Sequence, residues 1–502
     1  LSSTRTEIPR GQSGSSVTVI SGEELRRSGQ TLLHDALRGT PGLDVVRSGS
    51  PGQQTSVFIR GAESRHTKVM LDGIPLNDPS SPSRAFDFSN LAVENIERVE
   101  VLRGPQSTLY GSDAIGGVIN IVTRRGQGPA AYRFRTMGGR YGTFQQSASV
   151  SGSKDRVHYS LGGSYFESAG FTTAAPRLGN SEDDGFRNGN LSARFGWLAN
   201  EETDIDVVVR YTDAESQVDG FEYPVGPIDN LLRKLKNETF AMRTQLRNEI
   251  YDGLIEQKVG FGYTNLNRRD TDPGFGGTPA YDGSTVKFDW QANVLLYETT
   301  RTRNVFTTGL ENTTETASSS VADRRSLYAT GFFLQDHVVV DDNWSTVLGA
   351  RWDRYSAAGP ASTYRVTSRY ALDDSGTAFR GSIGTGFRAP AINELFDPSI
   401  GNLDLRPELS FGWELGMDQS FDDGDLVLGA TYFRNDIDDL IVFSFDGTGP
   451  WGGHLYNVDQ ALTAGVETTA TWQLGEGTTA TLGYTALDAR NRTTDSRLVR
   501  RP

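Results

Sequence analysis

Alternation of apolar with polar or small residues governs the sequence from Ala131 to the C-terminus. Phe240, Met242 and Leu246 are separated by small or polar residues, and Phe261 and Tyr263 by Gly262. Each run covers about ten to fourteen residues, which is longer than a typical globular strand and suits a tilted strand that crosses a membrane. About eighteen such runs follow one another, and this pattern predicts a large antiparallel transmembrane β-barrel.

The connections between the runs differ in length in a regular way. Short turns such as 341–343 and 422–424 alternate with long polar segments such as 167–190 and 212–237. One rim with tight turns and one rim with long loops is typical of outer-membrane barrels. A soluble β-sandwich or propeller is the alternative, but a propeller should show an internal repeat of about 40–50 residues, and none is visible.

Composition narrows the class of protein further. No run of apolar residues is long enough for a membrane helix, and the mean hydropathy is −0.44. The absence of cysteine excludes a disulfide-stapled module and a thiolate metal site. The net charge of −14 argues against a nucleic-acid partner. Five scattered histidines, without a nucleophile-elbow motif, give no basis for an enzyme.

Residues 1–127 follow a different pattern, typical of a small mixed α/β domain. Ser21 and Glu24 form a capping-box sequence that predicts the start of a helix, and a second short helix is predicted over 32–38. Short apolar strands are predicted at 56–60, 68–71, 96–102 and 118–122. We therefore expect one domain over 1–127 and the barrel over 128–502.

Motifs in both regions resemble those of TonB-dependent outer-membrane transporters. In the first region these are LHDALRGTPGLDV (33–45), FIRG (58–61), MLDGIP (70–75), IERVEVLRGP (96–105) and STLYGSDAIGGVINIV (107–122). In the second they are GTGFRAP (384–390), ELF (394–396), NLDLRPE (402–408) and GVE (465–467). The resemblance covers essentially the whole chain, in order.

The resemblance implies a plug domain inside a barrel in the outer membrane of a Gram-negative bacterium. It implies active uptake of a scarce small-molecule ligand by a monomer that is surrounded by outer-membrane lipid. Energy would come from a TonB-type complex of the inner membrane, contacted through a segment at or before Leu1. Barrels of this family have about 22 strands, so eighteen runs that end in a polar segment predict a barrel that lacks roughly four C-terminal strands.

Two acidic loops resemble the calcium-binding loops of the family's cobalamin receptors. These loops are NSEDDGF (180–186) and DGFEYPVGPID (219–229), and the implied Ca²⁺ ligands are Glu182, Asp184, Asp219 and Asp229. Flexible loops that carry several carboxylates can supply the oxygens that Ca²⁺ prefers. Glu182 replaces an aspartate of the family pattern, and Thr172 replaces another carboxylate. The resemblance thus favours cobalamin or another corrinoid as the ligand.

The resemblance also implies an ionic lock between the plug and the barrel wall. Arg60 and Arg103 of the plug would face Glu414 and Glu467 of the wall, because buried arginine–carboxylate pairs fix geometry with bidentate hydrogen bonds. Aromatic residues in the long loops are candidates for ligand contact by stacking. These residues are Phe221, Tyr223, Trp451 and Tyr456.

Three other functions remain open at this point. A ferric-siderophore or haem receptor of the same family would share the plug motifs. A passive outer-membrane pore or an adhesin would need no plug, and 127 residues of plug-like sequence argue against it. An outer-membrane enzyme would need a polar catalytic cluster at the rim, which the sequence does not offer.

Overall fold

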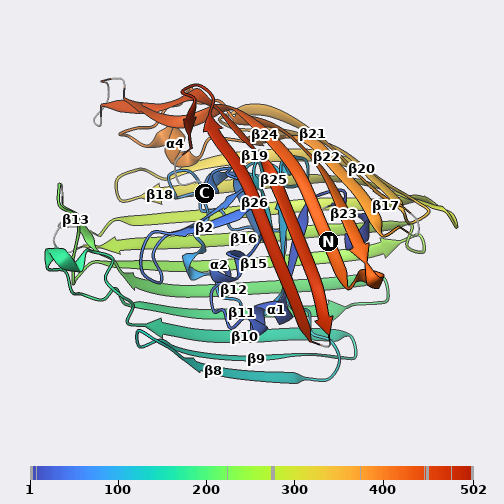
Figure 1. Cartoon of the computed structure of the whole chain (residues 1–502), viewed down its shortest axis with the longest axis horizontal. Helices are drawn as coiled ribbons and strands as arrows, with labels where there is room; N and C mark the ends of the chain where they lie inside the picture. Colours follow the sequence, from blue (N-terminus) through green and yellow to red (C-terminus); the bar gives the residue numbers. More distant parts are fainter. Residues whose placement is uncertain are drawn as a thin grey trace.

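A computed structural model describes the chain except residues 1–3, 7, 223, 273–277, 373–374, 446, 448–451, 476 and 499–502. Its first part is a small α/β domain inside a barrel that the rest of the chain forms (Figure 1). The expected fold class, a plug within a large antiparallel β-barrel, is confirmed, and the sandwich, the propeller and the pore without a plug are wrong. No helix among the described residues is long and apolar enough to span a bilayer.

The plug is built on a five-stranded sheet with the order β1-β6-β7-β4-β5, flanked by short helices. Its strands are β1 (Val17–Ser21), β4 (Thr67–Leu71), β5 (Ile74–Pro75), β6 (Ile96–Arg103) and β7 (Gly117–Thr123), with β2 (Leu43–Arg47) and β3 (Thr55–Ile59) in a separate pair. Its helices are α1 (Gly22–Arg27), α2 (Leu33–Leu37) and α3 (Ser107–Tyr110), with 3-10 turns at Arg10–Gln12, Ser64–His66 and Phe88–Asn90.

The local signals in the plug sequence are confirmed. Ser21 caps α1 as a capping box, because the Glu24 amide donates to Ser21 Oγ over 3.1 Å and the Ser21 amide donates to the Glu24 carboxylate over 2.6 Å. The apolar strands and α2 enclose a common core in which Leu33, Val69 and Ile119 are fully buried. The plug is therefore a folded unit with its own core, although a few of its residues also pack on the wall.

The barrel contains eighteen strands among the described residues, in an order that closes with β27 beside β8. These are β8 (Ala131–Gly138), β9 (Phe144–Lys154), β10 (Val157–Ser168), β11 (Phe186–Leu198), β12 (Thr203–Gln217), β15 (Lys234–Ile250), β16 (Ile255–Thr271), β17 (Ala280–Glu298), β18 (Thr302–Ser319), β19 (Arg325–Val340), β20 (Trp344–Tyr355), β21 (Gly359–Ala371), β22 (Thr377–Arg388), β23 (Glu408–Phe421), β24 (Leu426–Phe445), β25 (Gly453–Gly475), β26 (Thr478–Asn491) and β27 (Ser496–Arg497).

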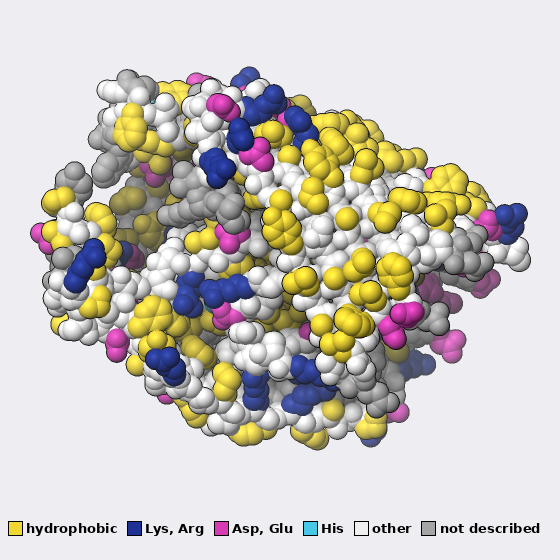
Figure 2. Space-filling model, viewed as in Figure 1, with side chains coloured by type: hydrophobic (Ala, Val, Ile, Leu, Met, Phe, Trp, Pro, Cys, Tyr) yellow, Lys and Arg dark blue, Asp and Glu magenta, His cyan; other side chains and the backbone are white. Residues whose placement is uncertain are grey.

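Side chains alternate between the lumen and the outer surface, as the sequence pattern predicts. On β23, Glu414 is buried towards the lumen, whereas the neighbouring Leu415 is 64% exposed on the outside. Figure 2 shows hydrophobic side chains gathered on the outer surface over β20–β25. Many strands are longer than the expected ten to fourteen residues, up to the 23 of β25, because they continue beyond the hydrophobic band.

The long connections lie together at one end of the barrel. At that end the β12–β15 loop carries a small hairpin of β13 (Gly220–Glu222) and β14 (Gly226–Ile228), and the β22–β23 loop carries α4 (Ile392–Phe396) (Figure 1). The β10–β11 loop, residues 169–185, contains a 3-10 turn at Pro176–Leu178. We call this end the loop rim. The opposite end, with tight connections such as 341–343 and the 3-10 turn Asp422–Gly424, is the turn rim.

Candidate functional site

The loop rim brings three of the predicted calcium ligands into one cluster. Glu182 comes from the β10–β11 loop, and Asp219 and Asp229 flank the β13–β14 hairpin in the next loop. One carboxylate oxygen from each lies within 4.8 Å of the other two. Asp184 adjoins the cluster through a shared neighbour, since Thr173 Oγ1 donates to Asp219 over 2.6 Å and lies 3.3 Å from Asp184 Oδ2.

Backbone amides fix this carboxylate cluster. The amides of Ser181 and Glu182 donate to Asp229 Oδ2 over 2.7 and 3.1 Å, so the second loop holds the first. The first loop in turn touches the plug, because Ser50 Oγ donates to the Asp184 carbonyl over 3.1 Å. The cluster therefore sits where two loops and the plug meet.

Five of the eight carboxylate oxygens of these four residues lack a hydrogen-bond partner. Both oxygens of Glu182 and Oδ1 of Asp184, Asp219 and Asp229 are buried without a hydrogen-bond partner. Among the described residues, none of the four forms an ion pair with a basic side chain. Buried carboxylates of this kind cost free energy unless a cation or protons neutralise them.

Burial and mutual repulsion shift the titration of two of these groups. Burial, followed by the nearby Asp219, raises the pKa of Asp184 to about 6. Burial and the charges of Asp219 and Asp229 also raise the pKa of Glu182. A set of several hard oxygens with no nitrogen or sulfur ligand is typical of a Ca²⁺ site, so the residues present fit that ion.

Thr172, the position where the family pattern has a carboxylate, forms a hydrogen bond within its own loop. Its Oγ1 donates to the Ala174 carbonyl over 3.2 Å. The next residue, Thr173, instead places its amide and hydroxyl against Asp184 and its hydroxyl against Asp219. Sequence reasoning missed Thr173, because a threonine in a polar loop carries no signal of its own.

The two described aromatic candidates, Phe221 and Tyr456, do not lie together in one site. Phe221 lies on β13 and is 67% exposed, whereas Tyr456 is half-buried on β25, in a different part of the loop rim. Tyr223 and Trp451 lie outside the described residues. Of the two described residues, Phe221 is the nearer in sequence to the carboxylate cluster, two positions after Asp219.

The structure brings the four residues of the predicted lock together. Arg60 Nε and Nη2 donate to the two oxygens of Glu467, each over 2.8 Å, and Nη1 donates to Glu414 over 2.6 Å. The Ser16 amide donates to the remaining Glu414 oxygen over 2.8 Å. Arg60 also lies over the ring of Phe433, with 4.4 Å between the guanidinium carbon and the ring centre.

We call this contact between Arg60, Glu414 and Glu467 the Arg60 anchor. Arg103 lies beside it and contributes less, and two backbone positions shape it. Arg103 Nε lies 3.4 Å from Glu467 without a hydrogen bond, and its Nη1 donates to Thr18 and to the Pro41 carbonyl. Arg60 has a φ of +49°, a strained conformation for a residue with a side chain. Gly42 has a φ of +75°, and a Cβ there would lie 2.0 Å from the Glu467 carboxylate, so only glycine fits.

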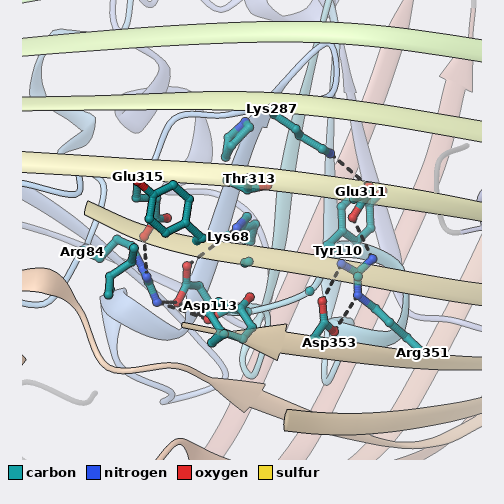
Figure 3. A pocket seen from close by; sticks show the side chains of 18 of the residues that line it. Lys68, Arg84, Tyr110, Asp113, Lys287, Glu311, Thr313, Glu315, Arg351 and Asp353 are labelled. Carbon is teal, nitrogen blue, oxygen red and sulfur yellow. Dashed lines mark hydrogen bonds and ion pairs between the residues drawn. The ribbon is translucent and has the colours of Figure 1, made fainter. Parts of the chain in front are cut away.

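Two further buried ion clusters join the plug to the wall. Arg388 forms a bidentate pair with Glu394 and a 2.6 Å bond to Glu408, which also lies 2.7 Å from His66 of the plug. Glu394 and Glu408 fall within the motifs quoted above, but the motifs did not indicate their partners. The other cluster centres on Glu311 and is shown in Figure 3.

A second group with metal-ligand chemistry lies near the turn rim. His158, Asp204 and Asp206 place one ligand atom each within 4.8 Å of one another. Arg125 already pairs with Asp204, and Arg194 Nε donates to Asp206 over 3.0 Å. Since each carboxylate has its own cation, this group is better described as an ionic contact between the plug's final segment and the wall.

Comparisons with known proteins agree with this architecture. The sequence model of the family described as "TonB-dependent Receptor Plug Domain" matches residues 9–118, and that described as "TonB dependent receptor-like, beta-barrel" matches residues 123–502. The vitamin B12 transporter BtuB of Photobacterium profundum is 28% identical over 493 residues, which are 97% of this chain and 77% of that protein.

Solved structures share the fold at lower identity. The siderophore receptor PirA of Acinetobacter baumannii aligns with a TM-score of 0.76 and 20% identity, over 96% of this chain and 81% of that one. The copper transporter OprC aligns with a TM-score of 0.78 and 17% identity, over 96% and 82% of the two chains. These two relatives carry different cargo on the same architecture, so the fold alone does not name a ligand.

Proposed function

The chain belongs to the family of TonB-dependent receptors, and from this premise we propose that it imports cobalamin or another corrinoid across the outer membrane. Proteins of this family bind a small-molecule ligand and depend on the TonB complex for transport. The ligand proposal rests on the identity to a vitamin B12 transporter and on the carboxylate cluster at the loop rim.

The carboxylate cluster carries the proposal because its unpartnered oxygens are of the kind that bind a cation. With Ca²⁺ bound, the repulsion among Glu182, Asp184, Asp219 and Asp229 would be reduced and the two loops would be tied to each other. The contact between Ser50 and the Asp184 carbonyl would connect this ordering to the plug. Ordered loops lose less conformational entropy when a ligand binds, so calcium would raise the affinity for the ligand.

Equilibrium binding of cyanocobalamin to the purified protein, with Ca²⁺ or with a chelator, tests the proposal. We expect tighter binding with Ca²⁺, and we expect Asp219→Asn to remove this dependence. Asp183→Asn is the matched control, because Asp183 is an exposed aspartate in the β10–β11 loop, between Glu182 and Asp184. Calcium-independent binding of cyanocobalamin would refute the role of the cluster.

Ferric siderophore or haem uptake is the second candidate within the family. The structural similarity to the siderophore receptor supports the shared fold only. Ferric enterobactin and haem therefore belong in the same binding assay. Binding of either one in place of cyanocobalamin would overturn the corrinoid assignment and leave the assignment to the family intact.

A further inference from the structure

Cavities between the plug and one side of the wall follow one another from rim to rim. A loop-side cavity of about 70 Å³ is lined by Leu71 and Leu76 of the plug. A middle cavity of about 270 Å³ is lined by Met70, Asp72 and Gly73. An inner cavity of about 550 Å³ reaches the turn rim at 253–254 and shares lining residues with the middle cavity.

Strand β16 gives the order of these cavities along the wall. Lys258, near its turn-rim end, lines both the inner and the middle cavity, and Leu266, near its loop-rim end, lines the loop-side cavity. Between them, Gly262 faces Ile74 and Thr264 Oγ1 donates to the Pro75 carbonyl over 3.1 Å. The β4–β5 hairpin is therefore the partition between the loop-side cavity and the middle cavity.

Within this hairpin β4 is fixed to the plug, because it pairs along its length with β7 and the Asp72 amide donates to the Ile121 carbonyl over 2.9 Å. Only the edge strand β5 is lightly held. β5 has two residues, lies at the edge of the plug sheet and pairs only with Met70 and Leu71 of β4. Asn77 fixes the base, because its side chain bonds the Val69 amide and the Thr67 carbonyl. A short edge strand of this kind can move with little loss of hydrogen bonding.

The Arg5 side chain obstructs the same route. Arg5 lines the middle cavity, and its Nη1 donates to Glu311 over 2.9 Å. Its Nε and Nη2 are buried without a hydrogen-bond partner. Lys287 and Arg351 also pair with Glu311, at 3.0 and 2.7 Å (Figure 3).

The ion pairs of Arg5 and of Arg60, on different sides of the plug, differ in whether breaking them would leave a buried carboxylate without a cation. When Arg5 withdraws, Glu311 keeps Lys287 and Arg351, so no buried charge is stranded. When Arg60 withdraws, Glu414 and Glu467 lose their principal cation inside the barrel. Because an uncompensated buried charge is costly, breaking the contact of Arg5 costs less than breaking those of Arg60.

We propose that the ligand crosses the plug along the β15–β17 wall, with the edge strand β5 and the Arg5 side chain as the movable parts. The Arg60 anchor holds the rest of the plug in place during this passage. Both signs of charge line the route, for example Arg243, Asp289 and Lys258, which suits a hydrophilic ligand with hydrogen-bonding groups around its periphery. This inference rests on the proposed transport function.

Engineered disulfides test the route cleanly, because the chain has no cysteine of its own. A Cβ on Gly262 would lie 3.9 Å from the Cβ of Ile74, which suits a disulfide between Ile74→Cys and Gly262→Cys. The matched control, Pro41→Cys with Gly483→Cys, has a corresponding distance of 3.5 Å and ties the plug to β26 instead. Uptake and surface binding of labelled cyanocobalamin are measured in oxidised and reduced cells.

We expect the oxidised pair at 74 and 262 to bind cyanocobalamin but to import none, and reduction to restore import. The oxidised control pair should import at its reduced rate. Import by the oxidised 74–262 pair, or an equal block in the control pair, would overturn the route. Binding without import by the unmodified chain would overturn the proposed function instead.

A second measurement needs no ligand. Gln245 lines both the inner and the middle cavity. If Arg5 closes this route, a Gln245→Cys thiol should react faster with a water-soluble reagent when Arg5→Ala is also present. An unchanged rate of modification would contradict the role of Arg5.

Discussion

Calcium affinity should fall steeply as the pH drops through 6, because Asp184 must lose its proton to bind the ion. With a pKa of about 6, Asp184 is about 97% ionised at pH 7.5 and about 9% ionised at pH 5.0, which weakens Ca²⁺ binding about tenfold. An aspartate at its ordinary pKa would stay ionised over this range. The raised pKa of Glu182 makes the fall steeper still.

The stability of the calcium-free loops should change with pH in the opposite direction to the calcium affinity. The pKa of Asp184 is higher in the folded protein than in the unfolded chain, so without calcium the ionised loops are less stable above pH 6 than below it. Calcium should therefore protect the loops most at neutral pH. Hydrogen exchange of residues 169–185 with and without Ca²⁺ reports this directly.

Calorimetric titration of Ca²⁺ into the purified protein at pH 5.0, 6.0 and 7.5 measures the affinity. Asp184→Asn should bind more weakly at pH 7.5 and show a flatter pH profile, whereas Asp183→Asn should keep the profile of the original chain. An affinity that stays constant from pH 5.0 to 7.5, or an unchanged slope in Asp184→Asn, would show that Asp184 does not control the pH dependence of calcium binding.

The remaining predictions concern the plug. Arg60→Ala should destabilise the attachment of the plug by about 3–5 kcal/mol, because it leaves Glu414 and Glu467 buried without their principal cation. Faster hydrogen exchange in β2 and β3 measures this, and rates like those of the original chain would count against the anchor. Ser21→Ala should cost about 1 kcal/mol in α1 alone. Exchange confined to α1 is the expected signature, and a global change would contradict it. Arg103→Ala should leave cyanocobalamin binding unchanged and raise antibiotic leakage less than Arg60→Ala does.

Local patterns in the sequence were sufficient to predict most of the fold. The alternation that places Glu414 inside and Leu415 outside follows from the strand pleat, and the cap at Ser21 follows from helix-end chemistry. Strand ends were less predictable, because hydrogen bonding continues beyond the hydrophobic band wherever neighbouring strands remain paired. The periodicity carries no signal that marks this continuation.

The partners of buried charges could not be predicted in the same way. Alternation shows that Glu311 faces the lumen, but it cannot show that the cation opposite is Arg5, 306 positions away in the chain. The carboxylate cluster and the lock were predicted through family resemblance, which carries pairings that periodicity does not. Thr173 escaped both approaches, since its role depends on the path of one loop.

Uptake of labelled cyanocobalamin by whole cells tests whether this chain imports a corrinoid with the help of TonB and calcium. The measurement compares cells that express this chain, with and without a functional TonB complex, in medium with and without Ca²⁺. We expect import of cyanocobalamin that requires TonB and that is faster with Ca²⁺. Surface binding without import in energised cells, or import that persists without TonB, would contradict it.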